Sequence, residues 1–318
     1  MNQQMGELDL QLRRLLQSCG VEHLAFYDRD RAKMVVAENS QPSERMPAEP
    51  SSRSLERAGR QLFYILEELA PDFAELRTGA LIRTVVRVPM GALLYQSVAM
   101  GFHLCTTTPQ DQVTELISRM TEGIDDLRPT VPYSLLPHRS YLSHLSRYTT
   151  AGTRTAPQSR TARQVTEVAD SIEGSSYTVD STAGTPAEVS DLLRAALGVD
   201  GLHYVAYYAA GMPSCTADIF RHRALSTHFG ASTTPQQRRD KYSLLGRLLP
   251  GVTRRMDTSL QALLEGRIHQ IVLNVEQGAV YFQHLKDGHY LLGVSLDHSR
   301  LAEADRHIEQ LAADLARG

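Results

Sequence analysis

The sequence predicts an α+β protein made of two tandem modules, each with the order helix, two strands, helix, three strands, helix. Three observations support this prediction: an internal repeat, short apolar strands that end at glycines, and a Ser/Thr-rich segment between the two halves. At 318 residues the chain is long enough for two domains. We expect a first module over 7–128, a flexible linker over 129–185 and a second module over 186–318.

The internal repeat is clearest in GALIRTVVRVPMGALLYQSVAMGFHLCTT (79–107) and GRIHQIVLNVEQGAVYFQHLKDGHYLLGV (266–294). Overlaid without a gap, these stretches share eight of 29 positions, three of them glycines. Upstream, residues 15–27 match 193–205 at an offset of 178, and 64–71 match 243–250 at an offset of 179. The blocks keep their order, which indicates a duplication with about eight extra residues after Pro250.

Local patterns place the elements of the first module. Apolar residues at 3–4 spacing from Leu8 to Cys19 predict a helix, and VEHLAFYD and AKMVVAE predict a hairpin. A second helix starts near Ser52 or Ser54, either of which could cap it, and stops or kinks at Pro71. Three strands, LIRTVVRV, ALLYQSVA and FHLCTTT, are joined at turns that contain glycine, and a last helix follows over 109–127.

The second module is expected to repeat this order. The predicted elements are a helix over 186–197, strands near 199–208 and 214–221, a helix over 235–249 with an added helical piece over 252–264, three strands within 267–294, and a helix over 300–316.

The segment between the modules has a different composition. Of the 58 positions in 129–186, nineteen are Ser or Thr, and few are large and apolar. Such a segment buries too little apolar surface to offset its ordering entropy, so we expect a mostly flexible linker. The stretch HRSYLSHLSRY (138–148) is an exception, because its Tyr and Leu residues could line a short amphipathic helix.

Composition narrows the class of protein. The formal net charge of −3 argues against duplex nucleic-acid binding, which depends on neutralising many phosphates. Apolar runs are too short to span a bilayer, and the N-terminal stretch lacks the apolar core of a signal peptide. Three distant cysteines suggest neither disulfides nor a zinc site. We therefore expect a cytoplasmic protein that contacts neither membrane nor nucleic acid.

Motifs for catalysis are not found in the sequence. It contains no P-loop, no GxSxG and no HExxH, and its twelve histidines match no usual ligand spacing. The adjacent carboxylates Glu67–Glu68 and Asp125–Asp126 point in different directions on helices and cannot share a substrate. The expectation is a protein that is not an enzyme, with no catalytic residue, cofactor or metal.

The element order and the glycine-bounded strands ending in DGHYLLGVSLD resemble the Roadblock family of dynein-light-chain-like modules, whose bacterial members are partners of small Ras-like GTPases. The resemblance covers about 7–127 and 186–317. It implies, for each module, a five-stranded antiparallel sheet with the middle helix on one face and the terminal helices on the other. Family members dimerise by pairing their third strands edge to edge and packing their middle helices side by side.

This resemblance implies that one chain can form a pseudo-dimer, since an unpaired edge strand is an association site. The segments TVVRV and IVLNV would then lie side by side, although pairing between two chains stays open. The expected interface residues are Thr84, Val86, Val88, Ile271, Leu273 and Val275.

The resemblance also implies a docking face for a GTPase on the paired middle helices. Basic residues at helical spacing are the candidates for this face: Arg53, Arg57, Arg60, Arg238, Arg239, Lys241 and Arg247. The expected function is a non-enzymatic regulator or scaffold for a small GTPase. Two alternatives are a tandem PAS- or GAF-like small-molecule sensor and a structural adaptor that does not depend on nucleotide. The sequence does not identify the GTPase or distinguish activation, exchange and tethering.

Overall fold

The computed structural model describes residues 2–37, 52–131, 164–166, 177–182, 185–230, 233–286 and 288–317. The chain divides into two compact units. The first unit comprises residues 1–71, 82–152 and 253–268, and the second comprises residues 72–81, 153–252 and 269–318.

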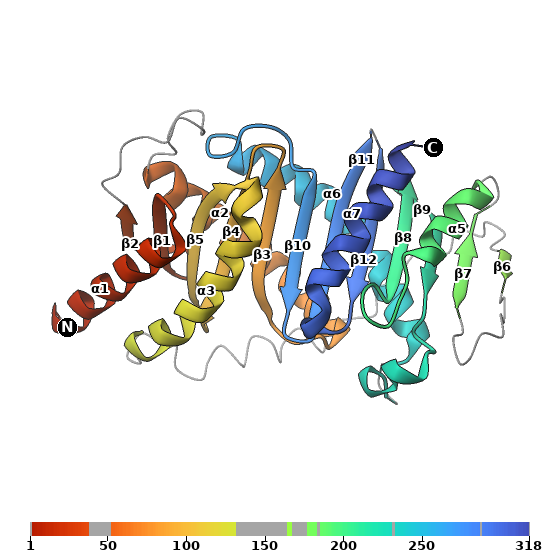
Figure 1. Cartoon of the computed structure of the whole chain (residues 1–318), viewed down its shortest axis with the longest axis horizontal. Helices are drawn as coiled ribbons and strands as arrows, with labels where there is room; N and C mark the ends of the chain where they lie inside the picture. Colours follow the sequence, from red (N-terminus) through yellow and green to blue (C-terminus); the bar gives the residue numbers. More distant parts are fainter. Residues whose placement is uncertain are drawn as a thin grey trace. The chain divides into compact units, whose positions relative to one another are not determined.

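The first unit contains a five-stranded antiparallel sheet. Its strands run in the order β2-β1-β5-β4-β3. Helices α1 and α3 lie on one face of this sheet and α2 lies on the other (Figure 1). The elements are α1 (Asn2–Cys19), β1 (His23–Asp28), β2 (Arg31–Ala37), α2 (Ser52–Leu76), β3 (Leu81–Val88), β4 (Gly91–Ala99), β5 (Phe102–Pro109) and α3 (Val113–Leu127).

The second unit contains a larger antiparallel sheet of the order β10-β11-β12-β8-β9-β7-β6. Helices α5 and α7 cover one face and α6 the other (Figure 1). The elements are β6 (Gln164–Thr166), β7 (Thr178–Ser181), α5 (Ala187–Ala195), β8 (Tyr204–Ala209), β9 (Met212–Asp218), α6 (Pro235–Leu260), β10 (Gln270–Val275), β11 (Gly278–Lys286), β12 (His289–Ser295) and α7 (Leu301–Arg317). The predicted α+β class is confirmed.

Strands β6 and β7 lie within the range expected to be a linker, so the expected five strands become seven in this unit. β7 pairs with β9, from Thr178 opposite Asp218 to Ser181 opposite Cys215. Just beyond β7, the Thr185 hydroxyl donates to the Ser214 carbonyl at 2.9 Å. The hydroxyl-rich composition that predicted flexibility here supplies hydrogen bonds instead. The stretch 138–148, expected to form a short helix, lies outside the described residues.

The same contact joins the middle helix to the sheet in both units. The buried ring of Tyr27 lies against Gly59 of α2, where an added Cβ would come within 2.4 Å of the ring. The buried ring of Tyr208 lies against Gly246 of α6, where a Cβ would be 2.1 Å from its hydroxyl. Each tyrosine also donates to a helix carbonyl, Tyr27 at 2.7 Å and Tyr208 at 3.2 Å. Only a glycine permits so close an approach.

The burial patterns of α2 and α6 correct the predicted alignment of these helices. Positions 187 residues apart are buried alike in the two helices, as at Leu55 and Tyr242 or Leu69 and Met256. This is the offset of the strands that follow, and the helices are 25 and 26 residues long. The predicted offset of 179 and the predicted insertion after Pro250 were therefore wrong, because they matched two prolines that are not structurally equivalent.

Neither proline ends its helix. α2 continues past Pro71 to Leu76, and α6 continues past Pro250 to Leu260. Pro71 is exposed and Pro250 half-buried, so each ring finds room at the helix surface. A proline within a helix removes a single backbone donor, and buried apolar residues on both sides of each proline hold the helix together.

The first hairpins of the two units also match, at an offset of 181 rather than the predicted 178. A bulge lies between Phe26 and Tyr27 in one, and between Tyr207 and Tyr208 in the other. The residue that turns each hairpin has a positive φ, 54° at Arg29 and 49° at Ala210. The earlier match rested on a Gly–Val pair that lies in a turn before β8.

Candidate partner-binding surface

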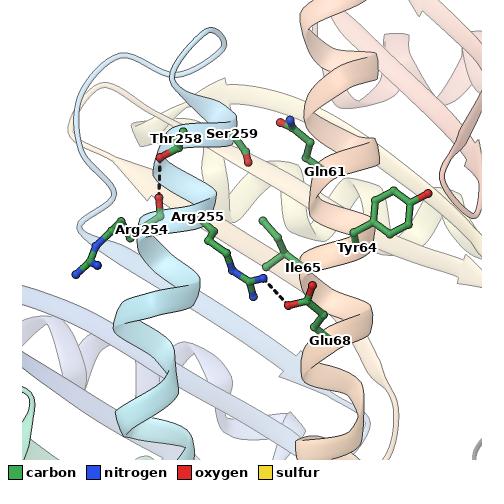
Figure 2. A pocket seen from close by; sticks show the side chains of 8 residues that line it. All are labelled: Gln61, Tyr64, Ile65, Glu68, Arg254, Arg255, Thr258 and Ser259. Atoms are coloured by element: carbon green, nitrogen blue, oxygen red, sulfur yellow. Dashed lines mark hydrogen bonds and ion pairs between the residues drawn. The ribbon is translucent and has the colours of Figure 1, made fainter.

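The outer sides of α2 and the C-terminal half of α6 form an open groove in the first unit (Figure 2). Its volume is about 480 Å³. Because α2 and residues 253–260 of α6 both bury their apolar faces, the residues that remain on the outside are mostly polar. The groove is lined by Gln61, Tyr64, Ile65 and Glu68 of α2 and by Arg254, Arg255, Thr258 and Ser259 of α6.

An ion pair crosses this groove. Figure 2 shows Arg255 extending from α6 toward α2, where its guanidinium donates to the Glu68 carboxylate. Arg254 points away from α2, and its backbone carbonyl accepts a hydrogen bond of 3.1 Å from the Thr258 hydroxyl. Both partners of the ion pair are exposed, 47% for Arg255 and 61% for Glu68, so solvent screens their attraction. The pair specifies geometry more than it adds stability.

Two hydrogen bonds connect the α2 side of the groove to the turn of the first hairpin. The Tyr64 hydroxyl donates to the Asp30 carboxylate at 2.7 Å, and Arg60 donates to the Asp30 carbonyl at 3.1 Å. The hydrogen bond from Tyr64 lowers the pKa of Asp30 and raises the pKa of Tyr64. Arg60, a predicted docking residue, therefore also holds the β1–β2 turn against α2.

Arg53 and Arg57 are exposed on α2, as a docking residue must be. They lie on the N-terminal part of the helix, one turn apart. Arg57 and Arg60 are neighbours at a spacing of three on the same side of the helix, which gives α2 a basic N-terminal part.

Two predicted docking residues face the interior of the second unit. Arg238 is 2% exposed, donates to the His228 carbonyl at 3.0 Å and stacks over Phe229 at 5.2 Å. Arg239 is ion-paired with Asp218 of β9, and the two side chains are 14% and 3% exposed. Arg239 also donates to the Thr178 hydroxyl of β7 at 2.8 Å. Both arginines stabilise the second unit, so neither belongs to an exposed docking face.

Lys241 is also engaged in the second unit. Its ammonium donates to the Glu75 carbonyl and lies 3.9 Å from the Glu75 carboxylate. Residues 72–81 belong to this unit, so the contact ties the end of α2 to the start of α6. The predicted docking role of Lys241 stays a prediction.

The outer side of α6 carries exposed apolar residues beside a basic one. Leu244 is 52% exposed and Leu248 is 41% exposed, one helical turn apart. Arg247 is exposed between them. We call Leu244, Arg247 and Leu248 the α6 stripe.

The predicted interface residues are all buried: Thr84, Val86 and Val88 of β3, and Ile271, Leu273 and Val275 of β10. β3 is the last strand of the first unit's sheet and β10 the first strand of the second unit's sheet. Within its unit, each pairs antiparallel with the strand that follows it in sequence.

No chemistry-bearing cluster accompanies this surface in the described parts of the chain. Among residues 2–37, 52–131, 164–166, 177–182, 185–230, 233–286 and 288–317, no group of three or more His, Cys, Asp or Glu residues could hold a metal ion. The helices that are described are too short or too polar to cross a membrane. The three cysteines are buried, and burial raises the pKa of each thiol.

Sequence reasoning missed several residues of this surface. Tyr64, Gln61 and Thr258 line the groove, and Leu244 lies on the α6 stripe. These residues could have been found by applying the 187-residue offset of the strands to the middle helices as well, because this offset separates the buried helix positions from the exposed ones. The fold and this surface together describe an α+β protein whose middle helices carry an open groove and the exposed α6 stripe.

No family model matches the sequence, and no curated protein matches it. Solved structures that are similar to the chain include one described as MglB with a tetrameric arrangement and the gliding protein MglB from Thermus thermophilus. Both are 18% identical to this chain, with TM-scores of 0.34 and 0.33, and cover 43% of it and 92% and 93% of their own chains. At these scores the similarity carries no conclusion about partners, so the proposals below rest on geometry and on the resemblance in sequence.

Proposed function

We propose that this protein is a non-enzymatic regulator or scaffold that binds a small Ras-like GTPase on its middle helices. The observation that carries the proposal is the α6 stripe, where Leu244 and Leu248 are exposed on either side of Arg247. Protein interfaces combine apolar anchors with arginine and avoid most other charged residues. The Roadblock resemblance supplies the kind of partner.

The basic residues that remain on the surface support a narrower docking face than the one expected from the sequence. Arg53 and Arg57 of α2 and Arg247 and Arg254 of α6 are exposed. We propose these four arginines, together with the α6 stripe and Tyr64, as the docking face.

We further propose that two Roadblock-like modules pair within one chain through β3 and β10. Contacts at both ends of these strands support the pairing. In the second unit, the backbone N–H of Glu276 donates to the Ala80 carbonyl at 3.1 Å and the backbone N–H of Gln277 donates to the Thr78 carbonyl at 3.0 Å. In the first unit, a Cβ on Gly266 would lie 3.2 Å from the Pro89 ring. These contacts, each within its own unit, are of the kind that antiparallel pairing of β3 with β10 would make.

If the protein accelerates GTP hydrolysis, the proposed mechanism acts through the partner. The docking face would hold the GTPase's own switch loops in the hydrolytic arrangement, which stabilises that state by differential binding. No arginine of this chain is assigned as a catalytic finger. In this mechanism the chain supplies a binding surface and no catalytic residue, so we propose that it is not an enzyme.

The test uses the purified full chain on lysate loaded with GDP or with a non-hydrolysable GTP analogue, and identifies retained proteins by mass spectrometry. We expect a small GTPase to be retained in one nucleotide state only. Arg57→Glu and Arg247→Glu should each weaken retention about tenfold, since charged interface residues contribute on the order of 1–2 kcal/mol. Arg14→Glu on α1, which covers the other face of the sheet, is the matched control and should retain the wild-type level.

Other outcomes separate the alternatives. Retention of the same partner in both nucleotide states would favour a structural adaptor. Retention of no GTPase in either state would contradict the proposal, and a search for a small molecule that raises the melting temperature would then test the sensor hypothesis.

A further inference from the structure

The C-terminal half of α2 and the outer side of α6 carry opposite charge. Residues 61–76 of α2 include four acidic residues and no basic one: Glu67, Glu68, Asp72 and Glu75. Residues 241–255 of α6 include four basic residues and no acidic one: Lys241, Arg247, Arg254 and Arg255. The docking proposal uses two of these arginines but gives the acidic residues no role.

The register of the two helices shows which of these charged residues occupy equivalent positions. At the 187-residue offset that aligns their buried faces, Glu68 is equivalent to Arg255 and Glu67 to Arg254. In an isologous interface residue i of one module contacts residue j of the other and j contacts i, so only residues at the twofold axis contact their own equivalents. Glu68 and Arg255 are ion-paired across the groove (Figure 2).

From these positions we infer that the charges of the middle helices make module pairing selective, so that a first module pairs with a second module and not with another first module. This inference rests on the proposed pairing of two modules and identifies the charges that determine which modules pair. A like pairing of first modules would place Glu68 against Glu68. A like pairing of second modules would place Arg255 against Arg255.

A second contact favours the same choice. Lys241 bonds Glu75, and the twofold mates of these positions are Ser54 and Ala262, which carry no charge. A pairing of two first modules would therefore lose the lysine, and a pairing of two second modules would lose the glutamate. The unlike pairing gains both ion pairs, whereas each like pairing gains neither and brings like charges together at the axis. Repulsion in the wrong complex selects partners even where each attraction is small.

The first experiment is a double-mutant cycle on the full chain. Glu68→Arg and Arg255→Glu each place like charges at the axis, and each should raise the unfolding equilibrium constant by about two- to fivefold, as expected for an exposed pair. The double variant restores opposite charges and should regain the wild-type value. Glu122→Arg on α3 makes the same charge change at an exposed position remote from the groove and is the control. Additive effects of the two reversals would overturn the inference.

The second experiment separates this inference from the pairing on which it rests. A full chain with a protease site placed within residues 140–160 is folded, cleaved and examined by native mass spectrometry. A complex of one first with one second module is expected, and Glu68→Arg should raise its dissociation constant about five- to tenfold, with recovery in the double variant. Complexes unaffected by reversal would overturn the selectivity and leave the pairing intact. Separation of the wild-type halves, or pairs of like halves, would overturn both.

Discussion

The middle helices α2 and α6 bury the same positions and carry different residues at the exposed ones. Both place a glycine against a buried tyrosine, at Gly59 and Gly246. Outside, Glu68 stands where Arg255 stands, and Tyr64 where Gly251 stands. Packing in the core tolerates little change in volume, whereas an exposed residue changes at small cost. What the two helices share therefore lies in the core, and what distinguishes them chemically lies on the surface.

The outer edges of the two sheets differ in the same way. β2 ends the strand order of the first unit, whereas β9, its counterpart, is followed by β7 and β6. Arg239 of α6 joins Asp218 of β9 to Thr178 of β7. The equivalent residue on α2 is Ser52, which cannot make these bonds. The added strands thus depend on a side chain that only the second unit carries.

The largest effect should come from removing that side chain. Arg239→Ala leaves the Asp218 carboxylate buried without its main partner, and breaking a buried ion pair costs about 3–5 kcal/mol. We expect the second unit to lose about 3 kcal/mol in urea unfolding and the β7 amides to exchange faster with deuterium. Arg247→Ala on the same helix is exposed and should change stability by less than about 0.5 kcal/mol.

The next effect concerns pH. His103 of β5 stacks on Tyr95 at 5.0 Å with both ring nitrogens buried, and burial lowers its pKa to about 4. Below about pH 6.5 the unfolded chain takes up a proton that the folded chain refuses, so stability falls as the pH drops toward 4, by at most about 3 kcal/mol. His103→Phe should remove this loss. The equivalent residue in the second unit is Tyr290, but burial also lowers the pKa of His203 and His228 in that unit, and their contributions remain in the variant. A pH dependence that is the same in His103→Phe as in the wild type would contradict the assignment.

A smaller, matched pair of effects tests the shared scaffold. Gly59→Ala and Gly246→Ala each force a methyl group into a buried tyrosine, which should cost about 2 kcal/mol in either unit, as overpacking does. Gly251→Ala lies on α6 with nothing within 4 Å of the added carbon, and should be neutral or stabilise by up to about 1 kcal/mol. Thermal unfolding followed by circular dichroism measures all three. Unequal losses at Gly59 and Gly246 would show that the two contacts are not equivalent.

The smallest effect is expected from Tyr64, which lines the groove. Tyr64→Phe removes the hydroxyl that lowers the pKa of Asp30, so this pKa should rise toward its ordinary value in an NMR titration. An unchanged pKa would show that the Arg60 contact, and not Tyr64, governs the carboxyl.

Sequence patterns predicted most of the fold because apolar spacing reports directly on burial. The three-strand blocks and the terminal helices lie close to where 3.6- and 2-residue periods placed them. The misplaced features had physical causes. Pro250 was taken as a helix end, yet the burial of Leu249 and Val252 on either side carries the helix through. β7 was missed because a strand of four residues is too short to show a recognisable alternation of apolar and polar side chains.

The candidate site was less predictable for a related reason. A basic residue at helical spacing has the same sequence signature whether it faces solvent or a buried carboxylate. Arg57 and Arg239 were thus indistinguishable until Asp218 was placed beside Arg239. The groove combines residues nearly 190 positions apart, and only the corrected helix register brings them together.

The most direct test of the paired-module account is hydrogen–deuterium exchange of β3 and β10 in chains confirmed as monomers by light scattering at the same concentration. We expect slow exchange of every second amide in β3, those that do not pair with β4, and of the matching amides in β10 that do not pair with β11. Fast exchange of these outward amides in the monomer would mean that the two strands are open edges, and would contradict pairing of the two modules within one chain.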